Sequence, residues 1–123
     1  MKNKEIASDH LPIVDTSFLQ EMFCNNTAVV KELELKFIQN SDEILLQMKK
    51  AEDSKDLNTL EFLGHKLKSS TKIIGALHCS DLCEKLEKAS MNKDWNISVQ
   101  LLTEIYEQMS EIKKYLQYDL DNH

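Results

Sequence analysis

Between residues 57 and 74, one histidine, two lysines and one serine are spaced so that a helix would bring them to one side. They are His65, Lys68, Ser69 and Lys72. At ~100° per residue, His65 falls ~160° away from the apolar stripe of this segment, so its imidazole is expected to point to solvent. Ser69 follows one turn later on the same face, Lys72 follows another turn on, and Lys68 borders the face. An imidazole exposed to water is mostly neutral at pH 7 and keeps a nucleophilic nitrogen.

The neighbours of His65 favour phosphoryl chemistry over acyl transfer. No serine or cysteine nucleophile is paired with it, and no carboxylate stands at an orienting spacing, Glu61 being the nearest acid on that side. Positive charge is plentiful, from Lys66, Lys68 and Lys72. A phosphoryl group on His65 would carry negative charge, which Lys68 could neutralise through a charge-assisted hydrogen bond.

Small side chains next to the histidine would let another protein approach the ring. Gly64, Ser69 and Ser70 supply them. From periodicity alone, His65 could equally be a surface histidine with no role. The phosphoryl interpretation therefore requires an outward ring that no metal and no neighbouring acid holds.

Helical periodicity predicts the elements that position this face. A short amphipathic helix over 16–23 precedes helices over 27–48, 57–74, 77–89 and 95–118. Their inward positions are Val30, Leu33, Phe37, Leu45, Met48, Leu57, Leu60, Leu63, Leu67, Ile74, Cys79, Leu82, Leu86, Ala89, Trp95, Leu102, Ile105, Met109, Ile112 and Leu116. Short links between long helices imply antiparallel neighbours. We therefore expect an all-α protein, an antiparallel up-down four-helix bundle with an additional short N-terminal helix.

Helix caps and chain ends complete this outline. Asp15, Asn26 or Thr27, Asp56, and Asn92 or Asp94 are the candidate N-caps, while Gly75 is the glycine that ends the helix over 57–74. The segment 51–55 is expected to be a polar connection. One domain is predicted over 13–118, with tails at 1–12 and 119–123.

Composition excludes several classes of protein. With 2 Gly and 1 Pro in 123 residues, a turn-rich β-sandwich is not expected, and no glycine-rich phosphate-binding loop is present. All 15 basic residues are lysines against 21 acidic residues, a net charge of −6, which disfavours nucleic acid and anionic membranes as partners. No apolar signal-peptide core and no membrane span are found, so a cytoplasmic location is expected.

The three cysteines raise the question of metal binding. Cys24, Cys79 and Cys83 are an odd number, typical of reduced thiols rather than of a disulfide framework. His78, Cys79 and Cys83 could share a helix face, but no fourth ligand stands at a useful spacing, and His65 points away. We expect no metal; Cys79 should face the core, and Cys24 should lie in the core or at its boundary.

The residues around His65 resemble a known family. His65-Lys66-Leu67-Lys68-Ser69-Ser70, followed by Gly75-Ala76, Leu82-Cys83 and Leu86-Glu87, is similar to the histidine-containing phosphotransfer (HPt) domain of multistep phosphorelays. The family pattern is His-x-Leu-Lys-Gly-Ser/Ala-Ser/Ala, with a glycine ten residues after the histidine and a Leu-Glu pair further on. The resemblance extends from about Leu11 to Leu116 and departs from the pattern at Ser69, where the family usually has glycine.

The resemblance implies a function and a site. His65 would be the phosphoacceptor and Lys68 would stabilise the phosphoryl group. Gly64, Ser69 and Lys72 would face the partner, and the motif is completed by Leu67, Ser70 and Gly75.

It also implies the partners. Receiver domains of response regulators or of a hybrid sensor histidine kinase would give and take the phosphoryl group, and Mg²⁺ would come from the receiver. The chain would be a monomeric carrier with no cofactor and no ATP site, rather than an enzyme. The alternative interpretations are a helical module that docks receivers without accepting phosphate and a helical metal-binding protein.

Overall fold

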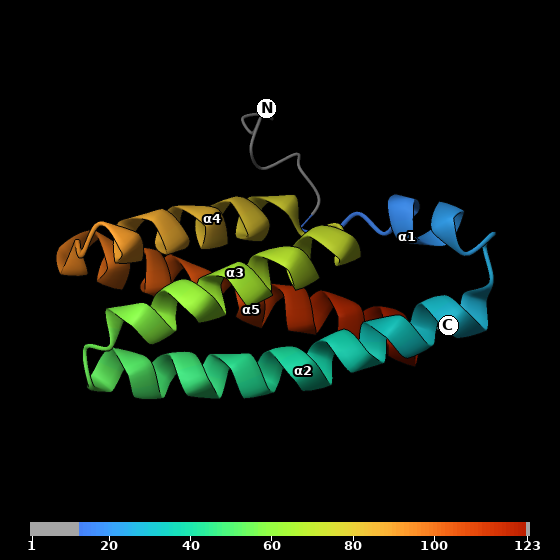
Figure 1. Ribbon diagram of the computed structural model, residues 1–123. Helices are drawn as coiled ribbons and strands as arrows, with labels where there is room; N and C mark the ends of the chain where they lie inside the picture. Colours follow the sequence, from blue (N-terminus) through green and yellow to red (C-terminus); the bar gives the residue numbers. More distant parts are fainter. Residues whose placement is uncertain (1–12, 123) are drawn as a thin grey trace, which may run out of the picture.

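The computed structural model describes residues 13–122, and within this range the backbone is helical and contains no strand. Its helices are α1 (Ser17–Met22), α2 (Thr27–Asp53), α3 (Leu57–Ile74), α4 (Leu77–Met91) and α5 (Trp95–Asp121). In Figure 1 the four long helices lie side by side, and each runs back along the one before it. The packed pairs α2–α3, α3–α4, α4–α5 and α2–α5 close the bundle, while α1 rests on α2 and α3. The predicted all-α bundle with a short N-terminal helix is confirmed.

Side-chain caps begin α2, α3 and α5 as the sequence indicates, whereas α4 begins after Ala76 without one. Asn26 accepts a hydrogen bond from the backbone N–H of Val29, Asp56 from that of Thr59, and Asp94 from that of Ile97. The prediction that Asp15 is the N-cap of α1 is wrong, because the N-cap position is held by Thr16. The Asp15 carboxylate still accepts a hydrogen bond from the backbone N–H of Ser17 at 3.0 Å.

Gly75 ends α3 in the left-handed conformation, with φ of 89°. A Cβ at this position would lie 1.7 Å from the carbonyl oxygen of Asp15, and the Gly75 carbonyl accepts a hydrogen bond from the Asp15 N–H at 3.0 Å. The glycine therefore serves both the helix end and the close passage of the segment that leads into α1.

Two helix ends differ from the sequence-based expectation. Helix α2 continues through most of the expected connection to Asp53, because Ala51 is buried and the Glu52 carboxylate accepts a hydrogen bond from the Tyr106 hydroxyl at 3.1 Å. Helix α5 continues to Asp121, where Leu120 packs against the core, so residues 119–121 are helical rather than tail. The expected tail over 1–12 lies outside the described residues.

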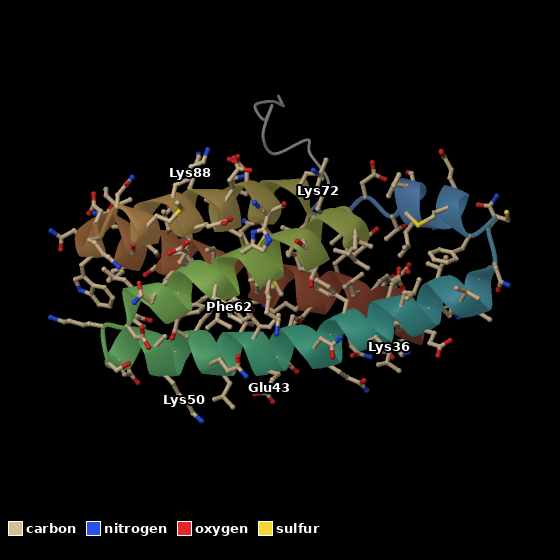
Figure 2. All side chains as sticks on the ribbon, in the orientation of Figure 1. Lys36, Glu43, Lys50, Phe62, Lys72 and Lys88 are labelled. Carbon is tan, nitrogen blue, oxygen red and sulfur yellow. The ribbon has the colours of Figure 1, made fainter. Side chains whose placement is uncertain are left out.

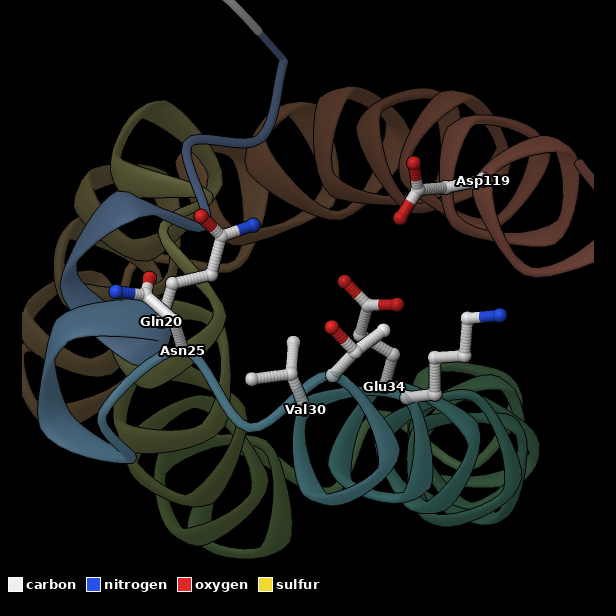
Figure 3. Close-up of a pocket in the computed structure, with 7 residues that line it drawn as sticks. Gln20, Asn25, Val30, Glu34 and Asp119 are labelled. Atoms are coloured by element: carbon white, nitrogen blue, oxygen red, sulfur yellow. The ribbon is translucent and has the colours of Figure 1, made fainter. Parts of the chain in front are cut away.

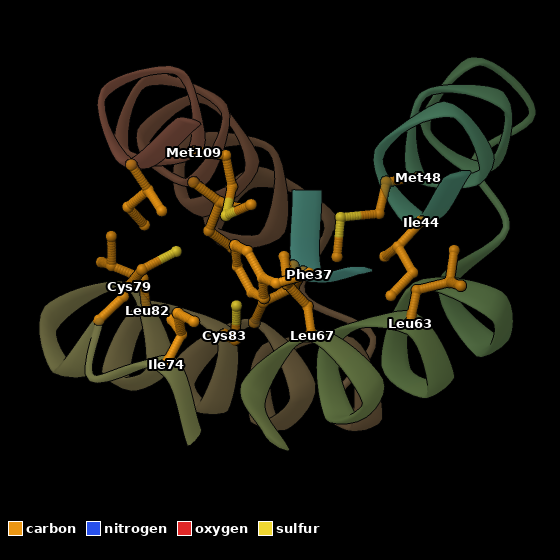
Figure 4. Packing of buried hydrophobic residues seen from close by; sticks show 14 of the residues in the cluster. Phe37, Ile44, Met48, Leu63, Leu67, Ile74, Cys79, Leu82, Cys83 and Met109 are labelled. Carbon is orange, nitrogen blue, oxygen red and sulfur yellow. The ribbon is translucent and has the colours of Figure 1, made fainter. Parts of the chain in front are cut away.

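The core runs along the middle of the bundle. Figure 4 shows Leu63 and Leu67 of α3 and Leu82 of α4 packing with side chains from α2 and α5. All the predicted inward positions are buried except Leu33, Leu45, Leu57 and Trp95, which are partly buried. Cys24 is exposed, against expectation, because it lies in the turn between α1 and α2 with a positive φ. Within 13–122, no helix has the length and apolar character needed to cross a membrane.

Candidate functional site

His65 stands on the outer side of α3. Its side chain is 60% exposed, while Leu63 and Leu67 on either side of it in the sequence are buried in the core. The apolar stripe thus fixes the rotation of α3, and this rotation sends the imidazole outward. The predicted orientation of His65 is confirmed.

A carboxylate from the neighbouring helix contacts the ring. Glu87 on α4 places Oε2 at 3.1 Å from Nδ1 of His65, and its Oε1 accepts a hydrogen bond from Nζ of Lys68, also at 3.1 Å. One acid therefore joins the histidine to the lysine three residues further along α3. Partial burial acts to raise the pKa of Glu87, but the hydrogen bonds and charges of Lys68 and His65 outweigh it and lower the pKa below its usual range.

The expectation that no acid orients His65 is wrong. Glu87 lies 22 residues away on another helix, so spacing along one helix could not reveal the contact. An ionised carboxylate only accepts hydrogen bonds, so Nδ1 carries a proton, and in the neutral ring Nε2 then keeps its lone pair. No residue within 13–122 hydrogen-bonds to Nε2. The requirement that no neighbouring acid hold the ring is therefore not met, and it was too strict, because an acid that contacts only Nδ1 orients the ring and leaves Nε2 open to phosphoryl transfer.

The other predicted polar residues lie around this pair. Lys68 is half-buried, whereas Ser69 and Lys72 are exposed on the same side of α3. The Ser69 and Ser70 hydroxyls donate to the carbonyls of His65 and Lys66 in their own helix, at 3.3 Å each. Their side chains are thus small and tied back to the backbone.

Gly64 is not part of the exposed face. It is buried between α3 and α4, and a Cβ there would stand 3.3 Å from the carbonyl oxygen of Cys83 and 3.5 Å from the backbone nitrogen of Glu87. The prediction that it lines the docking surface is wrong, because residue 64 faces α4 rather than solvent. Its missing side chain instead lets the two helices approach where Glu87 meets His65.

Comparison with known proteins decides the family. The Hpt domain family model matches residues 32–116, well over half of the chain, including His65, Lys68 and Glu87. The chain belongs to the Hpt domain family. It is therefore a phosphocarrier of phosphorelay signalling.

The fold of this Hpt domain agrees with a solved relative. The crystal structure of histidine-containing phosphotransfer protein B (HptB) from Pseudomonas aeruginosa PAO1 superposes with a TM-score of 0.84, covering 91% of this chain and 97% of that chain, at 17% sequence identity. At this identity the likeness concerns the fold. No curated protein sequence matches the chain.

Exposed apolar side chains that the sequence did not predict lie on α3 and at the start of α4; Phe62 shares a hollow with His65, and Leu77 shares one with Lys68. Phe62, Ile73 and Leu77 are all more than half exposed. Figure 2 shows Phe62 and Lys72 on α3, along the length of helix that carries His65. The ammonium of Lys66 lies 5.6 Å from the Phe62 ring centroid. The sequence does contain a signal for this surface, because these apolar residues stand at helix positions outside the buried stripe, where they must be exposed.

The candidate metal ligands on α4 do not all face the same way. Cys79 is buried, as predicted, and so is Cys83, whereas His78 is exposed. Among residues 13–122, no group of three or more His, Cys, Asp or Glu side chains is arranged to hold a metal ion.

Proposed function

We propose that His65 is the phosphoacceptor of this Hpt domain and that Nε2 is the reacting atom. The observation that carries the proposal is the exposed ring whose Nδ1 is held by Glu87, while Nε2 has no hydrogen-bond partner among residues 13–122. Nε2 attacks the phosphorus of an acyl phosphate on a receiver domain. The P–N bond forms as the P–O bond breaks, and the receiver aspartate leaves as a carboxylate with the electron pair. The reverse reaction loads the next receiver.

Glu87 and Lys68 support this transfer in different ways. Attack through Nε2 places positive charge on the ring while Nδ1 keeps its proton, and the Glu87 carboxylate at 3.1 Å stabilises that charge. Lys68 holds the other oxygen of Glu87 and brings an ammonium to the side of α3 where the phosphoryl group is added. Both residues are positioned by the close packing of α3 on α4.

The partners are receiver domains, either of response regulators or of a hybrid sensor kinase. Ser69 and Lys72, both exposed on α3, are the residues expected to meet them. Mg²⁺ for the reaction belongs to the receiver, and the chain acts as a monomeric carrier rather than as an enzyme with its own nucleotide site. We propose a cytoplasmic location as well, because Cys24, Cys79 and Cys83 are free thiols.

Labelling from a phosphorylated receiver tests the proposal. The wild-type chain should gain an acid-labile phosphoryl group, and His65→Gln should gain none. His78→Gln is the matched control, because His78 is an exposed histidine on α4 with no contact to Glu87. Label that persists in His65→Gln would contradict the assignment. Receiver binding by the wild-type chain without any labelling would favour the docking module instead.

A further inference from the structure

A cavity of about 240 Å³ lies between α1, the first turns of α2 and the last turns of α5. Figure 3 shows Glu34 of α2 and Asp119 of α5 directing their carboxyl groups into it, with Gln20 of α1 on the opposite wall. It shares no lining residue with the hollows beside His65. The cavity is therefore separate from the phosphoryl site.

Glu34 is buried beside this cavity, and one of its carboxyl oxygens lacks a hydrogen-bond donor within residues 13–122. The residue is 1% exposed, and its Oε1 has no hydrogen-bond partner among the described residues. Lys31 lines the same cavity and still leaves this oxygen unpaired. A buried acceptor without a donor costs free energy, more so when it is charged. A ligand that brings a donor would remove this cost.

The charges around Glu34 favour a cation. The pKa of Glu34 is raised to about 7, chiefly by burial and also by the charge of Asp119, while the charge of Lys31 opposes the rise. Asp119 on α5 and Lys31 on α2 are the titratable groups that line the cavity, and α1 contributes the neutral amide of Gln20. A positive group between the two carboxyls would interact favourably with both.

Size and donor set favour an organic cation over a metal ion. The cavity has about eight times the ~30 Å³ that one water occupies in the liquid. Within residues 13–122, no cluster of three or more His, Cys, Asp or Glu side chains suits a metal. Val30 gives the wall an apolar part against which carbon atoms can rest. We propose that this cavity binds a small organic ammonium ion, whose N–H groups donate to Glu34 and whose carbon chain packs on Val30.

Titration of the wild-type chain with n-butylammonium chloride, followed by NMR chemical shifts, tests the proposal. We expect saturable shifts at the residues that line the cavity and at least about tenfold weaker binding of the neutral analogue n-butanol. Because Glu34 must be ionised to pair with the ammonium, affinity should rise about tenfold between pH 6 and pH 8. Absence of saturable shifts, equal binding of n-butanol, or tighter binding of CaCl₂ than of butylammonium would overturn the proposal.

Paired variants locate the site. Glu34→Gln should weaken butylammonium binding at least about tenfold, while Glu32→Gln should bind as wild type, because Glu32 is exposed and pairs with Lys36. Circular dichroism reports whether Glu34→Gln is folded; if it is not, Asp119→Asn takes its place and should also weaken binding. Unchanged affinity in the folded variant would refute the site.

Discussion

A histidine that carries a phosphoryl group needs one ring nitrogen open and the other held. In this chain Nδ1 of His65 lies 3.1 Å from Glu87, and Glu87 in turn accepts a hydrogen bond from Lys68. Because the pKa of Glu87 lies below its usual range, its carboxylate stays ionised at neutral pH and keeps the proton on Nδ1. Three side chains from two helices thus make up the site that we propose for phosphoryl transfer.

Glu87→Gln is expected to slow phosphoryl transfer by about tenfold to a hundredfold, because a hydrogen bond to a charged group contributes about 1.5–3 kcal/mol. The amide oxygen of Gln can still accept a hydrogen bond from Nδ1, but it carries no charge and so stabilises the positively charged ring less than a carboxylate does. The rate of label transfer from a phosphorylated receiver measures this effect. Glu111→Gln on α5, where Glu111 is exposed and pairs with Lys114, should react at the wild-type rate. Equal rates for Glu87→Gln and wild type would show that the contact has no role.

Lys68→Ala is expected to slow transfer while leaving the helical circular dichroism unchanged, because Lys68 is half-buried beside Glu87 and lies outside the buried core. Lys85→Ala serves as the control, since Lys85 is exposed on α4 and pairs with Asp81. The same labelling assay measures both variants. A loss of helical signal in Lys68→Ala would mean that the lysine stabilises the fold rather than the transfer.

At the scale of elements, the site depends on how closely α3 approaches α4. Gly64 makes this approach possible, because its Cα faces the backbone of Cys83 and Glu87. The Ser80 hydroxyl adds a hydrogen bond across the same interface, to the carbonyl of Lys68 at 3.1 Å. Small side chains between the helices therefore set the distance between His65 and its carboxylate.

Gly64→Ala is expected to impair transfer more than it impairs folding. Alanine gains about 1 kcal/mol of helix propensity over glycine, which offsets part of an overpacking cost of about 1–3 kcal/mol. The added Cβ, 3.3 Å from the Cys83 carbonyl, must move α4 slightly and with it Glu87. We expect a change of at most about 2 kcal/mol in urea denaturation together with slower labelling. Wild-type labelling would show that the helix spacing does not govern the reaction.

For the molecule as a whole, the pH dependence of stability should depend on Glu34. The pKa of Glu34 is raised to about 7 in the folded chain, from an ordinary value of 4.5. Between these two values the folded state holds a proton that the unfolded state has lost, so the free energy of unfolding falls as pH rises through this window. Above about pH 7 both states are ionised and the effect is constant.

Glu34→Gln is expected to remove this fall. The gain in free energy of unfolding relative to wild type should grow from about pH 4.5 to about pH 7 and reach up to about 3 kcal/mol. Urea denaturation at a series of pH values measures it, and Glu32→Gln should show no such trend, since Glu32 is exposed. A gain that does not vary with pH would contradict the assignment of the titration to Glu34.

The sequence by itself determined the features that depend only on the spacing of residues within a single helix. Apolar spacing predicted the helices, their buried faces and the outward direction of His65, because the rotation of a helix follows from its own stripe. The sequence likewise predicted the helix caps, since each depends on residues within one turn. These are the N-caps Asn26, Asp56 and Asp94 and the C-terminal glycine Gly75.

Only the tertiary structure decided what depends on the fit between helices. Three features depend on how different helices meet, and no spacing along one helix fixes them. They are the contact of Glu87 with His65, the burial of Gly64 against α4, and the burial of Glu34 with one oxygen unpaired. The extra turns of α2 and α5 are held by packing of Ala51 and Leu120 rather than by local signals. Side-chain contacts between helices depend on their axial offset and distance, and these are set by the packing of the whole core.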